Sequence, residues 1–516
     1  MTKSLSFGMF PVRWVSDLGF GYGYPIFNFY APLAYYFGSL FNLSGLDPLL
    51  STKIMMFVGI FISGFSMYFL GKEVWGKMGG AISGLLYTFA PYHAVDIYVR
   101  GDVAEFWAYA FIPLVFYSLL KLNKTNKLRY LLLGAFSFSF VVLSHNLTAL
   151  MVTPFIFIFW LFLSLMNKKS IKKSLFLLTP LVFGLLISAF YWLPALSEMN
   201  FTNVISQVGG GADYRDHFVC LNQLWASPWG FGGSVKGCVD GVSFMIGKLH
   251  ILLSLAGIVL FVFAFILRKK EKEKIFVFLF SLSGLLLTVL LTLDVSKPVW
   301  DLIKPMGFFQ YPWRFLLLAS FFISFIGGSV VYYFDLFAKK KLFTVLFFIS
   351  LILAVSGFNS KYFFAQTYTN VSSKDFTNSH SLKWVTSNVT NEYMPKGFSK
   401  PTSFDQIPNA VSVRQGDVNI ISESSTPRKY IVSYESQDGG KIRVPIAYFP
   451  FWKAELDGNK FGYSVTSSGI SVMLPKGSHT LTLYYSQTLT EILANIISVC
   501  GILALIIVII FRRKAI

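Results

Sequence analysis

Long apolar runs alternate with short polar segments along most of the chain, and their lengths predict membrane-spanning helices. A helix needs roughly 20 apolar residues to cross the hydrocarbon core of a bilayer. Eleven runs approach or reach this length: 52–71, 78–92, 103–120, 129–145, 147–166, 174–194, 247–267, 275–293, 314–336, 342–358 and 489–511. We therefore expect a polytopic α-helical membrane protein with about eleven transmembrane helices.

The first 50 residues allow two interpretations. The segment 25–46 is apolar and aromatic enough to span, but Pro25, Pro32 and an excess of Tyr and Phe favour a segment lying in the outer interface. This second interpretation requires an additional span before residue 1, so that the chain would be a shortened form. No signal peptide begins the sequence.

Residues 359–488 are polar and rich in Ser and Thr, in contrast to the rest of the chain. Alternating runs at 429–434 and 480–485 are typical of strands, and the dipeptides Asp457-Gly458 and Lys476-Gly477 are typical of turns. We predict a β-sandwich domain over 359–488, between a transmembrane domain at 1–358 and a last helix with a basic tail at 489–516.

Clusters of Lys and Arg orient the predicted helices, because basic residues near span ends stay in the cytoplasm. When the spans are alternated, every cluster falls on the same side: 72–77, 121–129, 168–173, 268–274, 339–341 and 512–514. The opposite, exoplasmic side receives the loops rich in Asp, Trp, Tyr, Gly and His, together with the β-sandwich. We therefore expect a multi-pass plasma-membrane protein whose functional site faces outward.

Composition agrees with this class. The chain is 54% hydrophobic and 13% charged, and its mean hydropathy is +0.59. Its net charge of +19 lies in short clusters between apolar runs, which indicates anionic lipid headgroups and not nucleic acid. The three cysteines form no metal-binding pattern; Cys220 and Cys238 share one loop, and a disulfide and two free thiols both remain open.

Several stretches resemble known membrane families. The runs 11–14, 21–33, 98–105 and 310–315, which include Pro11-Val12-Arg13-Trp14, resemble bacterial membrane proteins labelled 6-pyruvoyl-tetrahydropterin synthase-related. The runs 448–458 and 474–479 are similar to the sandwich of YfhO-type proteins. No His-rich zinc site of a pterin synthase is visible, so the resemblance does not imply pterin chemistry.

The architecture that this resemblance implies is GT-C. Such proteins transfer a sugar from a polyprenyl-phosphate carrier at the exoplasmic face, using an Asp in the first outer loop. Here that acidic position would lie before residue 1. The implied partners are the polyprenyl-phosphate donor, membrane lipids and a glycan or protein acceptor, in cell-envelope glycan or glycoprotein assembly.

The location of the polar residues favours the same class independently. Nucleotide sugars are cytoplasmic, so a transferase with an outer site needs a donor delivered by lipid. Transfer also needs a carboxylate to take the acceptor proton and cations to stabilise the departing phosphate.

Three carboxylates are candidates for the catalytic role. Asp17 precedes the Gly-Tyr repeats around Tyr24 that could shape a sugar pocket, although an interfacial loop role explains it equally well. Asp102 and Glu105 open a predicted span at positions i and i+3, where they could bind an acceptor or a divalent cation. The same spacing is a capping-box arrangement. No other cofactor is implied.

Candidate substrate-binding residues lie beside these carboxylates or at other outer turns. Arg100 could hold a phosphate or pair with a carboxylate, and Arg314 follows Tyr311 and Trp313 at an outer span end. Lipid-phosphate binding and interfacial snorkelling both explain Arg314. His145 and His217 lie in outer turns, where a purely structural role is the alternative.

A second functional class stays open beside the transferase. The chain could bind or move a glycolipid without catalysis, with the sandwich as a recognition module; the absence of the first-loop carboxylate favours this alternative. A secondary transporter is disfavoured, because no acidic residue lies deep in a predicted span.

Overall fold

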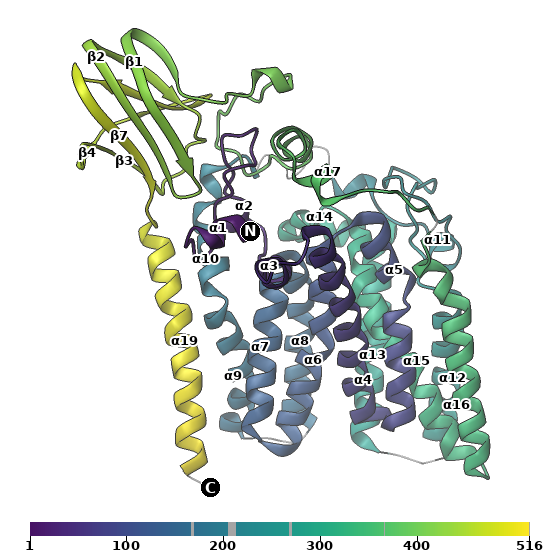
Figure 1. Cartoon of the computed structure of the whole chain (residues 1–516). Coiled ribbons are helices and arrows are strands. Elements are labelled where there is room, and N and C mark those ends of the chain that lie inside the picture. Colours follow the sequence, from purple (N-terminus) through teal and green to yellow (C-terminus); the bar gives the residue numbers. More distant parts are fainter. Residues whose placement is uncertain (167–169, 205–212, 268–270, 366, 515–516) are drawn as a thin grey trace. The chain divides into compact units, whose positions relative to one another are not determined.

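A computed structural model describes residues 1–166, 170–204, 213–267, 271–365 and 367–514 (Figure 1). The chain divides into two compact units. The helical unit comprises Lys53–Ser188, Val208–Tyr368 and Cys500–Ile516, and the sheet unit comprises Met1–Thr52, Ala189–Gln207 and Thr369–Val499. The predicted fold class, a polytopic helical protein with a β domain before the last helix, is confirmed.

The long helices are close to the predicted apolar runs. They are α4 (Pro48–Thr88), α6 (Val103–Thr125), α7 (Leu128–Ser144), α8 (Asn146–Met166), α9 (Ile171–Ile187), α12 (Lys248–Ile266), α13 (Lys272–Thr292), α15 (Leu316–Phe337), α16 (Lys341–Asn359) and α19 (Leu489–Lys514). Short elements of the helical unit are α5 (Pro91–Ala94), η1 (Val95–Arg100), η4 (Tyr214–Asp216), α11 (Leu221–Trp225), η5 (Asp294–Ser296), α14 (Lys297–Leu302), η6 (Lys304–Phe309), η7 (Pro312–Phe315) and η8 (Ser360–Phe363).

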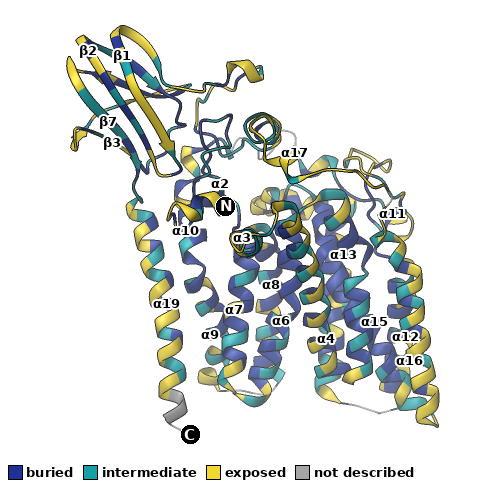
Figure 2. Ribbon diagram, in the orientation of Figure 1, coloured by how far each residue is buried: buried dark blue, intermediate teal, exposed yellow. Residues whose placement is uncertain are grey.

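Two helices form the centre of the helical unit. In the span formed by η7 and α15, 94% of the residues in the most apolar 18-residue stretch are buried, and in α6 the share is 83%. In the other spans only 22–44% of such residues are buried. Figure 2 shows the difference in exposure along these helices. The outer helices present large apolar side chains such as Phe57, Phe61 and Leu353. A bilayer is the solvent that suits such an exposed apolar surface.

The number of spans is smaller than the sequence predicted. In the described part of the chain eight helices are long and apolar enough to cross a membrane, or nine if α9 and the segment Ala189–Phe201, bent by 64°, form one span. The first difference is the bend after α9. The second lies in α7, which has only 17 residues. The third lies in α4, which joins the two predicted spans 52–71 and 78–92 in one 41-residue element.

Gly76 breaks α4 into two arms, since its φ of 74° and ψ of 177° are not helical. The arms pack against each other through glycines: a Cβ on Gly71 would lie 2.9 Å from Cα of Gly80, and one on Gly84 would lie 2.8 Å from the Gly64 carbonyl oxygen. Backbones approach this closely only where side chains are absent. The two crossings predicted for this segment therefore correspond to the two arms of a helical hairpin, of which the second arm is short.

Ion pairs gather several basic helix ends at one end of the helical unit. Glu73, beside the break in α4, binds Lys121 at 2.9 Å and Lys124 at 3.1 Å at the end of α6, and Lys124 also binds Glu273 at the start of α13. The predicted basic residues at 168–169 and 268–270 lie outside the described residues. These contacts join three of the segments that the basic pattern assigned to one side.

The sheet unit contains one curled, sandwich-like antiparallel sheet. Its strands are β1 (Ser412–Thr426), β2 (Lys429–Val444), β3 (Trp452–Leu456), β4 (Asn459–Phe461), β5 (Ser464–Thr466), β6 (Gly469–Leu474) and β7 (Gly477–Tyr485). The order is β4-β3-β7-β2-β6-β5, with β1 on the other edge of β2. β2 pairs with β7 through its first half and with β6 through its second half, so the sheet curls around it. The predicted turn at Asp457-Gly458 joins β3 to β4.

The core of the sheet unit combines strand residues with the N-terminal segment. The other helices of this unit are α1 (Thr2–Ser6), α2 (Ile26–Phe29), α3 (Leu33–Leu43), α10 (Ala189–Glu198), η2 (Met199–Phe201), α17 (Ser373–Thr377), η9 (Ser381–Thr386), α18 (Ser387–Val389) and η10 (Phe404–Gln406). Trp14 packs edge-on against Phe451 and Trp452, with ring centroids 5.4 and 5.5 Å away. The backbone of Gly23 packs so closely against the Trp14 indole that an added Cβ would lie 2.0 Å from the ring. The segment thus supplies an aromatic wedge to the sheet.

The glycine contacts in α4 predict an asymmetric response to alanine. Gly80→Ala should destabilise the protein, because the new Cβ would lie 2.4 Å from the Lys72 backbone nitrogen and would push the two arms apart. Gly357→Ala in α16 is the matched control, since no atom lies within 4 Å of its added Cβ. It should be neutral, or stabilising by up to about 1 kcal/mol through helix propensity. Thermal unfolding midpoints in detergent measure both, and equal midpoints would contradict the hairpin packing.

Candidate functional site

Arg100 is the centre of a buried charged cluster at one end of the helical unit. From the end of η1, its Nη1 donates to Asp96 and, at 3.2 Å, to the hydroxyl of Tyr92. Its Nη2 donates to Asp102 at 2.7 Å and to Glu105 at 3.0 Å. One guanidinium therefore binds three carboxyl groups, an arrangement that its fork of five donors permits.

Asp102 and Glu105 have different roles within this cluster. Asp102 is the N-cap of α6, since its Oδ1 accepts a hydrogen bond of 3.0 Å from the Glu105 backbone N–H. The Glu105 side chain does not complete a capping box; its Oε1 accepts at 2.6 Å from the Tyr92 hydroxyl and its Oε2 accepts from Arg100. Helix capping thus explains one oxygen of Asp102. The Glu105 side chain, which is only 1% exposed, contacts the charged cluster through the hydrogen bonds above.

Arg314 extends the cluster from η7. Its Nε lies 3.6 Å from Glu105 Oε2 without forming a hydrogen bond, and its Nη1 donates to the Phe309 carbonyl oxygen at 3.1 Å. The side chain is buried, so it does not reach toward water as a snorkelling arginine would. Among the described residues its Nε has no hydrogen-bond partner.

Aromatic rings line both arginines. The Arg100 guanidinium carbon lies 4.7 Å from the ring centroid of Trp313, and that of Arg314 lies 5.2 Å from the ring of Tyr311. The two rings stack on each other with centroids 4.9 Å apart. Cation–π contacts of this kind stabilise guanidinium groups in a desolvated position.

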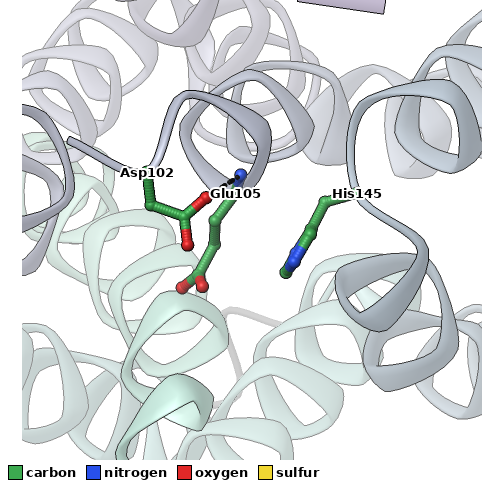
Figure 3. A group of neighbouring side chains, drawn as sticks. All are labelled: Asp102, Glu105 and His145. Atoms are coloured by element: carbon green, nitrogen blue, oxygen red, sulfur yellow. Dashed lines mark hydrogen bonds between the residues drawn. The ribbon is translucent and has the colours of Figure 1, made fainter. Parts of the chain in front are cut away.

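His145 faces the same two carboxylates from the turn between α7 and α8 (Figure 3). Atoms of Asp102, Glu105 and His145 able to bind a metal lie within 4.8 Å of one another. His145 Nδ1 is 2.7 Å from the Thr148 hydroxyl. This donor set suits a divalent cation chemically, but both carboxylates already bind Arg100, and an ion would have to share them with the guanidinium.

His217 joins the cluster through Tyr311, whose ring centroid lies 4.8 Å away. Its Nδ1 is 3.1 Å from the hydroxyl of Ser234 in the same loop. A disulfide between Cys220 and Cys238 closes this loop, which resolves the alternative that the sequence left open. The disulfide closes the segment 220–238, which contains Ser234, and His217 lies just before this segment.

Burial and charge separate the protonation of two carboxyl groups in the cluster. Burial, together with the nearby carboxylate of Glu105, raises the pKa of Asp96 well above its usual range. Burial acts in the same direction on Asp102, but Arg100, His145 and Arg314 overcome it and lower the pKa of Asp102 to about 2. Asp102 is therefore ionised at neutral pH, whereas the surroundings of Asp96 favour its protonated form more than water does.

The two remaining predicted site residues belong to the sheet unit. Asp17 forms an ion pair with Lys3 at 2.8 Å and is partly exposed. Tyr24 is fully buried in the core of that unit, where its hydroxyl accepts from the Tyr393 backbone N–H at 3.1 Å. Lys3 and Tyr393 also belong to the sheet unit, so these contacts hold Asp17 and Tyr24 within it.

Asp96 and Tyr92 belong to the cluster, although neither was among the predicted site residues. Both are almost fully buried, and Asp96 Oδ2 has no hydrogen-bond partner among the described residues. The available signal was their distance from Arg100 along the chain, at i−4 and i−8. That signal required knowledge that η1 is helical, because only a helical turn brings these positions together.

The comparison with known proteins agrees with the motifs found in the sequence. Residues 27–208 match the 6-pyruvoyl-tetrahydropterin synthase related domain, a membrane protein family. The predicted family is confirmed for this segment. The 6-pyruvoyl-tetrahydropterin synthase related segment includes Asp96, Arg100, Asp102, Glu105 and His145.

A relative is found in Lactococcus lactis subsp. cremoris (strain MG1363), where it is described as an uncharacterized protein. It is 28% identical over 190 residues, which are 35% of this chain and 30% of the relative. The matched part thus spans about a third of that protein's length, and it shows similarity without indicating an activity.

The shared guanidinium predicts a large stability effect at Arg100. Arg100→Ala should lower the free energy of unfolding by about 3–5 kcal/mol, because it leaves buried carboxylates without their cation. Arg100→Lys should recover only part of this loss, since a single ammonium cannot reach all three carboxyl groups. Thermal unfolding in detergent provides the measurement.

Arg215→Ala is the matched control for this experiment. Arg215 also binds two carboxylates, Asp213 at 3.2 Å and Asp301 at 3.0 Å, but its side chain is 51% exposed. Water replaces such partners easily, so this variant should unfold close to the parent. If the unfolding midpoints of both variants fell by a similar amount, the buried cluster would stabilise the protein no more than an exposed ion pair does.

Proposed function

We propose that this protein transfers a sugar from a polyprenyl-phosphate carrier to a glycan or protein acceptor at the exoplasmic face. The observation that carries the proposal is the buried Arg314, whose Nε lacks a hydrogen-bond partner in the described structure and lies beside carboxylates and an aromatic wall. A buried guanidinium with an unused donor is suited to an incoming anion. A lipid phosphate supplies an anion at the depth of a span end.

The residues of the cluster fit the chemistry of such a transfer. The bond between the sugar and the carrier phosphate breaks, and the acceptor oxygen forms a new bond to the sugar. Arg314, with Arg100, would stabilise the negative charge that develops on the leaving phosphate. A carboxylate would take the proton of the acceptor hydroxyl, and Asp102, ionised at neutral pH, is the group suited to that role.

A second candidate function is glycolipid binding without catalysis, and one observation favours it. Both oxygens of Asp102 and both of Glu105 already accept hydrogen bonds, from Arg100, Tyr92 and the Glu105 backbone. Each of these oxygens keeps a second lone pair, but a general base must direct one at its substrate, and the hydrogen bonds fix both carboxylates toward Arg100, Tyr92 and the backbone. In the transferase, the carrier phosphate would have to displace one of these carboxylates from Arg100; in the binding protein it would not.

Binding of a short-chain polyprenyl phosphate to the purified protein tests the anion site. Arg314→Ala should weaken binding by about 10–100-fold, the value of one or two hydrogen bonds to a charged group. Arg314→Lys should also weaken it, because an ammonium lacks the planar fork. The corresponding polyprenyl alcohol should bind all variants equally weakly, which separates phosphate recognition from prenyl burial.

Arg129→Ala is the control variant. Arg129 also lies against a tyrosine, 4.8 Å from the ring of Tyr130, but it follows the opposite end of α6 and is not part of the cluster. Its affinity for the lipid phosphate should equal that of the parent. If Arg314→Ala and Arg129→Ala bind equally well, Arg314 does not recognise the phosphate, and the main support for a lipid-phosphate donor is lost.

Cysteine accessibility tests the proposed orientation. In a protein whose native cysteines are replaced by serine, cysteines at Ser170 and Lys340 should be protected from an impermeant thiol reagent applied to intact cells. Cysteines at Lys236 and Ser422 should react; both positions are exposed, so folding does not hide them. The reverse pattern would place the charged cluster in the cytoplasm and contradict an exoplasmic transfer.

A further inference from the structure

The sheet unit contains a cavity of about 440 Å³, and none of the residues that line it belongs to the charged cluster. The N-terminal segment lines one part of it and the sheet with its loops lines the rest. The Gly21-Tyr22-Gly23 repeat, which the sequence suggested as the wall of a sugar pocket, belongs to this lining. The volume lies in the range of small-molecule sites in proteins, about 300–1,000 Å³.

Aromatic residues form the rigid part of the cavity. Trp14, Tyr22, Tyr430 and Trp452 all line it, and each is more than nine-tenths buried. Trp14 and Trp452 contact each other edge to face with centroids 5.5 Å apart, and Gly23 packs closely against the Trp14 indole. The indole N–H of Trp452 is itself buried and has no hydrogen-bond partner among the described residues.

Hydrogen-bonding groups complete the lining. Asp17 is held by Lys3, and Glu423 accepts from the Tyr430 hydroxyl and from the Val411 backbone N–H. Lys383, Asn409 and the hydroxyls of 424–426 add further donors and acceptors. The two acidic side chains, Asp17 and Glu423, balance the two basic ones, Lys3 and Lys383, so the lining has no net formal charge.

We propose that this cavity binds a neutral saccharide unit. A sugar ring presents C–H faces, which pack on aromatic rings, and hydroxyls, which both donate and accept hydrogen bonds. The lining offers the complementary groups: amphipathic aromatic residues, carboxylates, an amide and hydroxyls. Its balanced charge disfavours a phosphate or another strongly anionic group, which is the ligand proposed for Arg314.

The inference deepens the proposed function without depending on its chemical step. A saccharide held by the sheet unit would be the acceptor glycan of the transferase or the sugar part of a glycolipid in the binding protein. Recognition of sugar and recognition of lipid phosphate would then use different residues. Each of the two proposals can therefore fail while the other survives.

Binding of the full-length protein in detergent to an array of neutral, N-acetylated and anionic oligosaccharides is the primary experiment. The parent should retain neutral or N-acetylated glycans. Asp17→Asn combined with Glu423→Gln should weaken that binding at least tenfold, because two charged acceptors become weaker ones. Asn409→Trp should abolish it by filling the cavity from an exposed loop position, where the fold tolerates a large side chain.

Glu435→Gln is the matched control, since Glu435 lies exposed on β2, the strand that pairs with the one carrying Glu423, and it does not line the cavity. It should bind glycans as the parent does. All cavity variants should also bind the polyprenyl phosphate normally, whereas Arg314→Ala should lose the lipid and keep the glycan. Thermal unfolding confirms that each variant is folded.

Four outcomes would overturn the proposal. The parent could retain no glycan at millimolar concentration, or it could retain only anionic ones. The folded Asn409→Trp protein could bind glycans like the parent, in which case binding occurs elsewhere. Retention of peptides in place of glycans, tested with an extended Ser/Thr-rich peptide, would assign the cavity to a protein partner and contradict the saccharide assignment.

Discussion

The helical unit depends on the sharing of the Arg100 guanidinium among Asp96, Asp102 and Glu105. A charge at the end of a buried helix is expensive unless it is paired and hydrogen-bonded. Here one cation and several acids satisfy each other, and the tie connects η1 to the first turn of α6. Glu105 also lies 3.6 Å from the Nε of Arg314 in η7, which begins the most buried span.

The same cluster has a property expected of a binding site, because two of its buried polar atoms are left without hydrogen bonds in the described part of the chain. The Arg314 Nε and the Asp96 Oδ2 lack hydrogen bonds in the described structure, although both atoms are buried. Each buried polar atom without a partner costs free energy, so its presence in a folded protein calls for an explanation. Unused donors and acceptors beside stacked aromatic rings are therefore the physical reason to look for an anionic ligand at this cluster.

The sheet unit depends on a comparable buried arginine with a different surrounding. Arg13 donates to Asn28 at 2.9 Å and to the Phe190 carbonyl oxygen at 2.8 Å, and its Nε lies 3.3 Å from Glu491. These contacts join the N-terminal segment to α10 and to the start of α19. They hold Trp14 in the core and so shape the wall of the cavity for which a saccharide is proposed.

The sequence by itself determined the class of the protein and most of its elements. Run lengths located the long helices, alternation located β2 and β7, and the turn dipeptide at Asp457 located a hairpin, because each depends on neighbours along the chain. The sequence also selected eight residues that the structure joins through contacts in one cluster: Arg100, Asp102, Glu105, His145, His217, Tyr311, Trp313 and Arg314. Their common position at helix ends and turns on one predicted side of the membrane was enough, since helix ends on one side of a membrane share a plane.

The tertiary structure alone decided the pairing and the competition among these groups. That Asp96 and Tyr92 belong to the cluster, that Asp17 lies in another unit, and that Gly76 folds α4 back on itself depend on contacts or backbone angles that no local pattern encodes. Sequence distance groups residues 1–52 with the helices, but Trp14 and Tyr24 contribute to the core of the sheet unit more than 350 residues away. The hydrophobic effect is non-directional. A run of aromatic residues therefore predicts that these residues are buried, but it does not predict which part of the chain they pack against.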